Sequence, residues 1–124
     1  MLGKVDTVMR TVREMERSVR FYRDALGFDP EMVSPHGSIF RGHGGSRLAL
    51  HIHDPEHGPF PEPGRATASL GWHVADIRAG VAALQERDVT FGAGPQEQDW
   101  GWIAHFEDPD GHIHWIAQPK DAGC

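Results

Sequence analysis

The stretch SVRFYRDALGF, at residues 18–28, has the pattern of a helix and of the turn that ends it. Val19, Tyr22 and Leu26 recur at spacings of three and four residues, which places them on one face of a helix. Gly27 follows at the position where a left-handed residue commonly ends such a helix. The pattern therefore predicts an amphipathic helix that packs one side against another element.

The same order of elements is expected twice along the chain. Around the first helix, β-branched residues and turn signals predict one strand before it and three strands after it. In the second half, Asp76 is a good N-cap for another amphipathic helix, again with one strand before it and three after it. The expected strands are 5–12, 28–34, 38–41, 47–53, 67–74, 89–91, 100–106 and 112–117.

A Pro- and Gly-rich segment separates the two halves. Nothing in residues 54–66 favours a helix or a strand, so this segment is expected to be a linker. It divides a single domain, 1–124, into a first module at about 1–55 and a second at about 67–120. One module alone could bury little core, so the two are expected to pack together or to swap in order to cover their sheets.

Composition excludes several classes of function. The chain has 124 residues and a formal net charge of -6, which makes nucleic acid an unfavourable partner. No apolar run is long enough to cross a bilayer, and the N-terminus lacks the apolar region of a signal peptide, so we expect a cytoplasmic protein with no membrane partner. The one cysteine, Cys124, cannot form an internal disulfide.

Three motifs in order resemble one known family. They are SVRFYRDALGF at 18–28, WHVADI at 72–77 and DPDGH at 108–112. Together they resemble the glyoxalase, bleomycin-resistance and extradiol-dioxygenase superfamily, also called the vicinal oxygen chelate superfamily, over about residues 5–118. The resemblance implies an α+β fold in which two tandem βαβββ modules form a curved sheet around a cleft.

The resemblance also implies where a divalent metal would be held in the enzymes of the family. Their His, Glu or Gln ligands map here onto Thr7, Ala49, Ser69 and Trp115, with His51 replacing Ala49 if the register slips by two. Hydroxyl oxygens are weak ligands for such a metal, and an indole has no lone pair available to bind one. We therefore expect no metal and no other cofactor, as in the bleomycin-resistance branch that the resemblance favours.

Strand alternation and the resemblance together assign a set of residues to the cleft. An aromatic residue at the former metal position, Trp115, would offer a flat face to a planar or cationic ligand. By the same alternation His114 should face the helices, and Trp72 and Trp102 should pack in the core. The expected ligand-binding residues are Thr7, Met9, His51, Ser69, His73, Trp100, Ile103, His105 and Trp115.

The first functional hypothesis is therefore a binding protein rather than an enzyme. It would be a metal-independent homodimer that captures a small aromatic or cationic molecule, with a drug-sequestering or resistance role implied by the resemblance. The dimer is expected from exposed strand edges and from the habit of the family. No Ser-His-Asp order, cysteine beside a histidine or phosphate-binding glycine loop nominates a catalytic residue.

Two alternatives stay open. His51, His73 and His105 could form a rearranged metal site, which would make the protein a metal-dependent lyase, isomerase or dioxygenase. The last strand discriminates between the readings, because a shift of one residue would turn His114 instead of Trp115 toward the cleft. A regulatory ligand sensor without chemistry is the third possibility.

Overall fold

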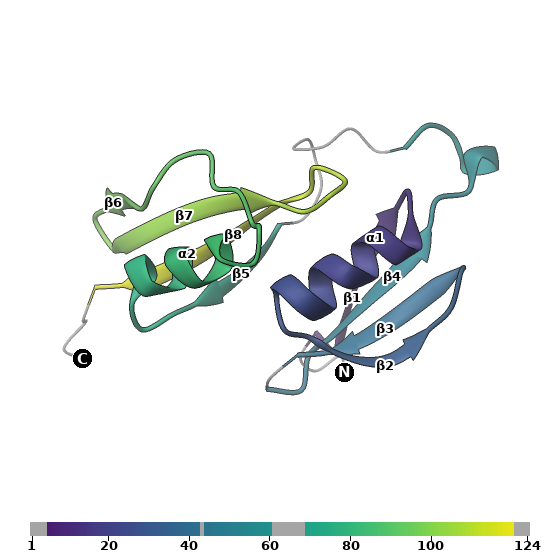
Figure 1. Cartoon of the computed structure of the whole chain (residues 1–124), viewed down its shortest axis with the longest axis horizontal. Coiled ribbons are helices and arrows are strands. Elements are labelled where there is room, and N and C mark those ends of the chain that lie inside the picture. Colours follow the sequence, from purple (N-terminus) through teal and green to yellow (C-terminus); the bar gives the residue numbers. More distant parts are fainter. Residues whose placement is uncertain (1–4, 43, 61–68, 121–124) are drawn as a thin grey trace. The chain divides into compact units, whose positions relative to one another are not determined.

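The computed structural model describes residues 5–42, 44–60 and 69–120. The chain divides into two compact units, unit 1 at Met1–Pro61 and unit 2 at Glu62–Cys124 (Figure 1). Each unit contains one four-stranded mixed sheet and a helix that follows the first strand of that sheet. The predicted α+β class with two tandem βαβββ modules is confirmed.

Unit 1 places a helix after its first strand. Its sheet has the order β1-β4-β3-β2, in which β1 runs parallel to β4 and the other pairs are antiparallel. The two hairpins connecting β2, β3 and β4 are local, whereas the β1–β4 pair requires a crossover through the helix. The elements are β1 (Thr7–Val12), α1 (Met15–Arg20), the π-helical turn η1 (Phe21–Ala25), β2 (Asp29–Val33), β3 (Gly37–Arg41) and β4 (Arg47–Ile52).

The core of unit 1 lies between α1–η1 and one face of this sheet. Tyr22 and Phe40 are fully buried, and their ring centroids are 6.4 Å apart. Val12 and Leu50 supply the even-numbered, helix-facing positions of β1 and β4. Because strand residues alternate between the two faces of a sheet, the odd-numbered residues of these strands point to the opposite, open face.

Unit 2 repeats the arrangement. Its sheet has the order β5-β8-β7-β6, in which β5 runs parallel to β8. Asp76 begins the helix as predicted, and its side chain accepts a hydrogen bond from the backbone N–H of Ala79 at 3.2 Å. The elements are β5 (Leu70–His73), α2 (Ile77–Gln85), β6 (Gln96–Gln98), β7 (Gly101–Glu107) and β8 (Ile113–Pro119).

The core of unit 2 again fills the side of the sheet that faces the helix. Ile77 and Val81 of α2 are buried, as are Phe106 of β7 and Ile116 of β8. A tight turn joins β7 to β8, and the buried Asp108 carboxylate accepts two backbone N–H groups of that turn. This turn fixes which residues of the two strands lie opposite each other.

The first helix differs in detail from the expectation. The first helix does not continue as a regular α-helix to Leu26, because the Leu26 N–H bonds to the Phe21 carbonyl five residues back. Spacings of three and four residues do not distinguish one wider turn from α-helix, since both keep Tyr22 and Ala25 buried. Gly27 does adopt the left-handed conformation expected of it, with φ 79°.

The linker and the loop before β7 also contain more structure than the sequence indicated. Asp54 and Pro55 begin a short 3-10 helix, η2 (Pro55–His57), because Asp54 accepts the N–H of Glu56 at 2.9 Å. The expected strand at 89–91 is only an isolated bridge at Phe91, and the edge strand β6 forms later, at Gln96–Gln98. Of the strand expected at 67–74, residues 67 and 68 lie outside the described residues.

Candidate functional site

The open face of the unit 2 sheet is centred on Trp115. In the middle of β8, this residue lies opposite His105 of β7 on one side and Gly71 of β5 on the other. All three share the open face because directly paired strand residues point to the same side of a sheet. Trp115 is partly buried, although α2, the helix of this unit, packs on the other face of the sheet.

Gly71 makes room for the Trp115 ring. A Cβ atom added at Gly71 would lie 1.9 Å from Cε2 and 2.0 Å from Cζ2 of Trp115, which is far inside van der Waals contact. The indole therefore lies down over the backbone of β5 instead of standing away from the sheet. This position leaves an aromatic surface spread along the open face, with one ring face turned away from the strands.

Two histidines and two apolar residues surround this ring. The His73 ring is tilted by 43° to the Trp115 ring, with 6.4 Å between centroids. His105 is exposed, and Ile103 pairs with the buried Ala117 beside it. The surface around the indole therefore combines apolar contact area with imidazole groups that can donate or accept hydrogen bonds.

One carboxylate lies at the end of the same face. Glu107 is exposed and pairs with Ile113, two residues along each strand from the His105–Trp115 pair. Among the described residues of β5, β7 and β8 that share the open face, Glu107 is the one with a formal charge. The face is therefore electrostatically better suited to a cation than to an anion.

His114 lies on the other side of the sheet. Its side chain is fully buried, and its ring contacts Trp72 and Phe106 with centroid distances of 5.8 and 5.6 Å. The backbone N–H of Leu70 donates to His114 Nδ1 at 3.4 Å. With His114 held in the core, the register that would turn it toward the open face does not occur.

The residues expected to bind ligand in unit 1 share the open face of that unit's sheet. Thr7 and Met9 lie on β1, where Met9 pairs with Ala49, and His51 lies on β4 opposite Thr11. Met9 is 67% exposed, so this face carries an apolar side chain that unit 1 itself does not bury. The structure thus brings Thr7, Met9 and His51 to one face of unit 1, and His73, Ile103, His105 and Trp115 to one face of unit 2.

An ion-pair network closes one end of the unit 1 face. Glu31, the extra residue of a bulge in β2, accepts hydrogen bonds from Arg41 Nε at 2.8 Å and from Arg47 Nε at 3.0 Å. These two guanidinium groups hold the pKa of the Glu31 carboxyl below its usual value, with the Arg47 hydrogen bond as the larger cause. The network links β2, β3 and β4. The negative charge of Glu31 is already neutralised by the two arginines and is not left to attract a cationic ligand.

Two predicted site residues lie at the margins. Ser69 is exposed and immediately precedes β5. Trp100 lies in the turn before β7 instead of inside the strand, where its carbonyl accepts the N–H of Lys120 at 2.8 Å, and its side chain is 49% exposed. Neither residue is placed against Trp115 by any contact among the described residues.

The residues at the implied metal positions do not fit a divalent metal. Thr7, Ala49 and Ser69 provide at most hydroxyl donors, and the Trp115 indole has no lone pair to offer. Within either unit, the described residues bring no three His, Cys, Asp or Glu side chains together as a metal site requires. His73 and His105 stand on strands at opposite sides of Trp115, so the ring separates the two imidazoles.

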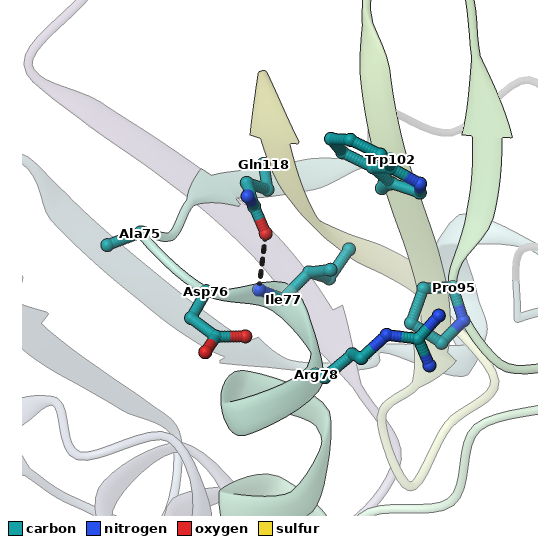
Figure 2. A pocket seen from close by; sticks show the side chains of 7 residues that line it. All are labelled: Ala75, Asp76, Ile77, Arg78, Pro95, Trp102 and Gln118. Carbon is teal, nitrogen blue, oxygen red and sulfur yellow. Dashed lines mark hydrogen bonds between the residues drawn. The ribbon is translucent and has the colours of Figure 1, made fainter. Parts of the chain in front are cut away.

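Unit 2 also has a cavity that the sequence did not predict. Trp102 was expected in the core, but it is only partly buried because it lines a cavity beside the start of α2, together with Arg78 and Gln118 (Figure 2). The strand parity of Trp102 was right, since it lies on the helix side of the sheet. Parity does not tell how far along the sheet a helix extends, and α2 leaves this end uncovered.

No helix in the described part of the chain combines the length and the apolar character needed to cross a bilayer. None of the curated proteins matches the sequence significantly. Solved structures do match, over nearly the whole chain.

An antibiotic-binding protein from Streptomyces sp. CB03234, TnmS3, is 28% identical, with 96% of this chain and 98% of that chain covered and a TM-score of 0.78. The protein ATC0852 from Agrobacterium tumefaciens is 23% identical, with 95% and 98% covered and a TM-score of 0.79. A superfamily member from Sphaerobacter thermophilus DSM 20745 is 22% identical, with 94% and 98% covered and a TM-score of 0.75. The last two likenesses show the shared fold.

A family model matches residues 4–116, from the start of the first module to the middle of β8, and the match includes Trp115. The chain belongs to the Glyoxalase/Bleomycin resistance protein/Dioxygenase superfamily.

Proposed function

We propose that this protein binds a small planar molecule without the help of a metal, and that binding serves to sequester a drug-like compound. The ligand binds on the open face of the unit 2 sheet, called here the Trp115 face, which carries His73, Ile103, His105, Glu107 and Trp115. The observation that carries the proposal is the Trp115 ring lying over Gly71. A large aromatic surface that is already held in place loses little conformational freedom when a ligand stacks on it. His73 and His105 beside it can orient polar groups of the ligand.

The charge of this face favours a cationic ligand. Glu107 supplies a carboxylate on the same face, and the indole itself attracts a cation placed over its ring. A planar molecule with an amine at one edge would use both groups at once. The likeness to TnmS3, named as an antibiotic-binding protein, supports a ligand of drug size.

Metal independence is supported by the donor set. Enzymes of the family use the metal to polarise oxygen atoms of the substrate, and the mapped positions here supply hydroxyls, a methyl group and an indole. A lyase, isomerase or dioxygenase would need another set of ligands. Neither open face brings three metal-ligating side chains together among the residues described.

A homodimer remains a prediction of the proposed function. The edge strand β2 exposes Met32 and Val33, which are 47% and 53% exposed. Unpaired strand edges with apolar side chains are commonly covered by a second chain. Sedimentation velocity at micromolar concentration would give the mass, and a monomer would contradict the dimer without affecting the ligand proposal.

The proposed function is tested with doxorubicin, which is planar, cationic and fluorescent. We expect saturable binding to the wild-type protein, seen as a change in doxorubicin emission, and at least about tenfold weaker binding to Trp115→Ala. The matched control is Leu84→Ala on α2, which removes apolar area on the helix side of the same sheet and should leave the affinity unchanged.

Metal dependence is tested in the same titration. The expected affinity is the same after dialysis against EDTA and after addition of Zn²⁺, Mn²⁺ or Fe²⁺. An affinity that disappears with EDTA and returns with one of these ions would contradict the proposal and favour the metal-dependent alternative. Equal binding by wild type and Trp115→Ala would contradict the assignment of the site to the Trp115 face.

A further inference from the structure

A cavity lies on the helix side of the unit 2 sheet, at the end that α2 leaves uncovered (Figure 2). Its volume is about 360 Å³, within the range of pockets that bind small molecules. Ile77 and Pro95 supply apolar walls, and Trp102 adds an indole from β7. Since Trp102 and Trp115 differ by strand parity, this cavity and the Trp115 face lie on opposite sides of the sheet.

The start of α2 is not the basis of a binding site, because two of its first amides, those of Ile77 and Ala79, already donate to side chains. Gln118 Oε1 accepts the N–H of Ile77 at 2.8 Å, and the Asp76 carboxylate accepts the N–H of Ala79 at 3.2 Å. Gln118 is thereby fixed as part of the cavity wall. Any selectivity of the cavity for charge must come from side chains.

Arg78 is the cationic group that remains available. It is exposed and has no hydrogen bond or ion pair within residues 5–42, 44–60 and 69–120. The other nearby cation, Lys120, lies 5.6 Å from the centroid of the Trp102 ring but is paired with Glu97 at 3.0 Å. The cavity is therefore lined by one positively charged side chain, Arg78, that no ion pair among the described residues neutralises.

The arrangement of these side chains separates the charges. Figure 2 shows the Arg78 side chain reaching from α2 toward Pro95, with Trp102 across the cavity, while Asp76 lies at the other end. An anionic group beside Arg78 would thus be on the far side of the cavity from the Asp76 carboxylate. A guanidinium group binds a carboxylate through two parallel hydrogen bonds, which fixes orientation as well as charge.

We propose that this cavity binds an aromatic carboxylate, with its ring against Trp102 and Pro95 and its carboxylate on Arg78. The site is additional to the proposed ligand site on the Trp115 face, and its ligand has the opposite charge. A ring system of one or two rings matches the cavity volume. The neighbouring amide of Gln118 is available as a hydrogen-bond donor through its nitrogen, because its oxygen is held by Ile77.

The test uses 1-naphthoate as the probe and ¹H–¹⁵N NMR spectra of the full chain. We expect the indole N–H resonance of Trp102 and the Nε–H resonance of Arg78 to shift and saturate, while the indole resonance of Trp115 stays in place. Arg78→Gln should weaken binding at least fivefold. The matched control, Arg87→Gln beyond the other end of α2, should bind like wild type.

Two further probes separate charge from stacking. The neutral 1-naphthamide should bind more weakly than 1-naphthoate to wild type and equally to wild type and Arg78→Gln. Trp102→Leu should weaken both compounds, and its spectrum also reports whether the fold is intact. If Arg78→Gln binds 1-naphthoate as wild type does, the proposal is overturned.

The test of the cavity gives a result that is separate from the test of the proposed function. Shifts at Trp115 and His73 instead of Trp102 would show that 1-naphthoate occupies the open face, which overturns the second site. Doxorubicin binding that survives Arg78→Gln while 1-naphthoate binding is lost would support two independent sites. Equal doxorubicin binding by wild type and Trp115→Ala would contradict the proposed function, whereas the cavity proposal is decided by 1-naphthoate binding to Arg78→Gln.

Discussion

The indole of Trp115 occupies the space that a side chain at Gly71 would need, on the neighbouring parallel strand. Gly71→Ala should therefore lift or rotate the ring. Overpacking of this kind costs about 1–3 kcal/mol, and replacing a strand glycine with alanine recovers about 0.5–1 kcal/mol. We expect a net loss of stability in urea unfolding, together with weaker doxorubicin binding, because the ring no longer lies along the face.

Gly92→Ala is the matched control for this substitution. A Cβ atom added at Gly92 would meet no atom within 4 Å, and the backbone φ of Gly92 is not positive. The control should unfold at the wild-type urea concentration and bind doxorubicin with wild-type affinity. If Gly71→Ala behaves in the same way, the ring does not depend on the gap at Gly71, and the geometry that carries the proposed function is wrong.

The neighbouring residue His114 should matter for stability instead of binding. Its fully buried ring packs on Trp72 and Phe106, so His114→Ala leaves a cavity that costs about 2–4 kcal/mol. His105→Ala, on the exposed side of the sheet, should stay within about 0.5 kcal/mol of wild type. Urea unfolding measures both. If His114→Ala is stable but no longer binds doxorubicin, the register of β8 described above is wrong, because His114 would then lie on the open face.

How much of this site could be read from the sequence depends on the range of the interactions involved. Alternation along one strand is a local property, and it separates Trp115 from His114 without knowledge of any partner strand. The same local rules predict the Asp76 cap and the left-handed Gly27. Each of these features rests on residues within one helix or strand, where backbone geometry alone decides the outcome.

The features that were missed depend on residues distant in sequence. The space that Gly71 leaves for Trp115 exists only because β5 pairs with β8, 44 residues away in register. The edge strand β6 is rich in Gln and Glu and has no apolar alternation, so only its pairing with β7 makes it a strand. The cavity beside Trp102 arises because α2 covers part of the sheet, which no single segment specifies.

The turn between β7 and β8 should be sensitive to one oxygen atom. Asp108 Oδ1 accepts the N–H groups of Asp110 at 3.0 Å and of His112 at 2.8 Å, and the side chain is buried. Asp108→Ala would leave both amides without this acceptor, at a cost of about 2–4 kcal/mol. Asp108→Asn keeps the acceptor and should lose less than half as much. Equal losses in urea unfolding would show that charge, not the acceptor geometry, stabilises the turn.

The Glu31 network should make unit 1 more stable at neutral than at acidic pH. Arg47 and Arg41 lower the pKa of Glu31 in the folded state below its ordinary value of 4.5. A carboxyl whose pKa is lowered by folding contributes stability above its unfolded pKa and loses it as the pH falls through the folded pKa. Glu31→Gln should therefore lower the Tm slightly at pH 7, by a few degrees at most because the pair is near the surface.

Circular dichroism melts between pH 7 and pH 2.5 measure this difference. The Tm gap between wild type and Glu31→Gln should be largest near neutrality, shrink below pH 4.5 and vanish once Glu31 is protonated in the folded state. High salt should reduce the gap at pH 7, because exposed ion pairs are screened. The control is Glu86→Gln, since Glu86 has no ion pair within the described ranges and should show no gap at either pH. A gap for Glu31→Gln that grows as the pH falls would have the wrong sign for a carboxylate held by two arginines, and would exclude the network as the cause.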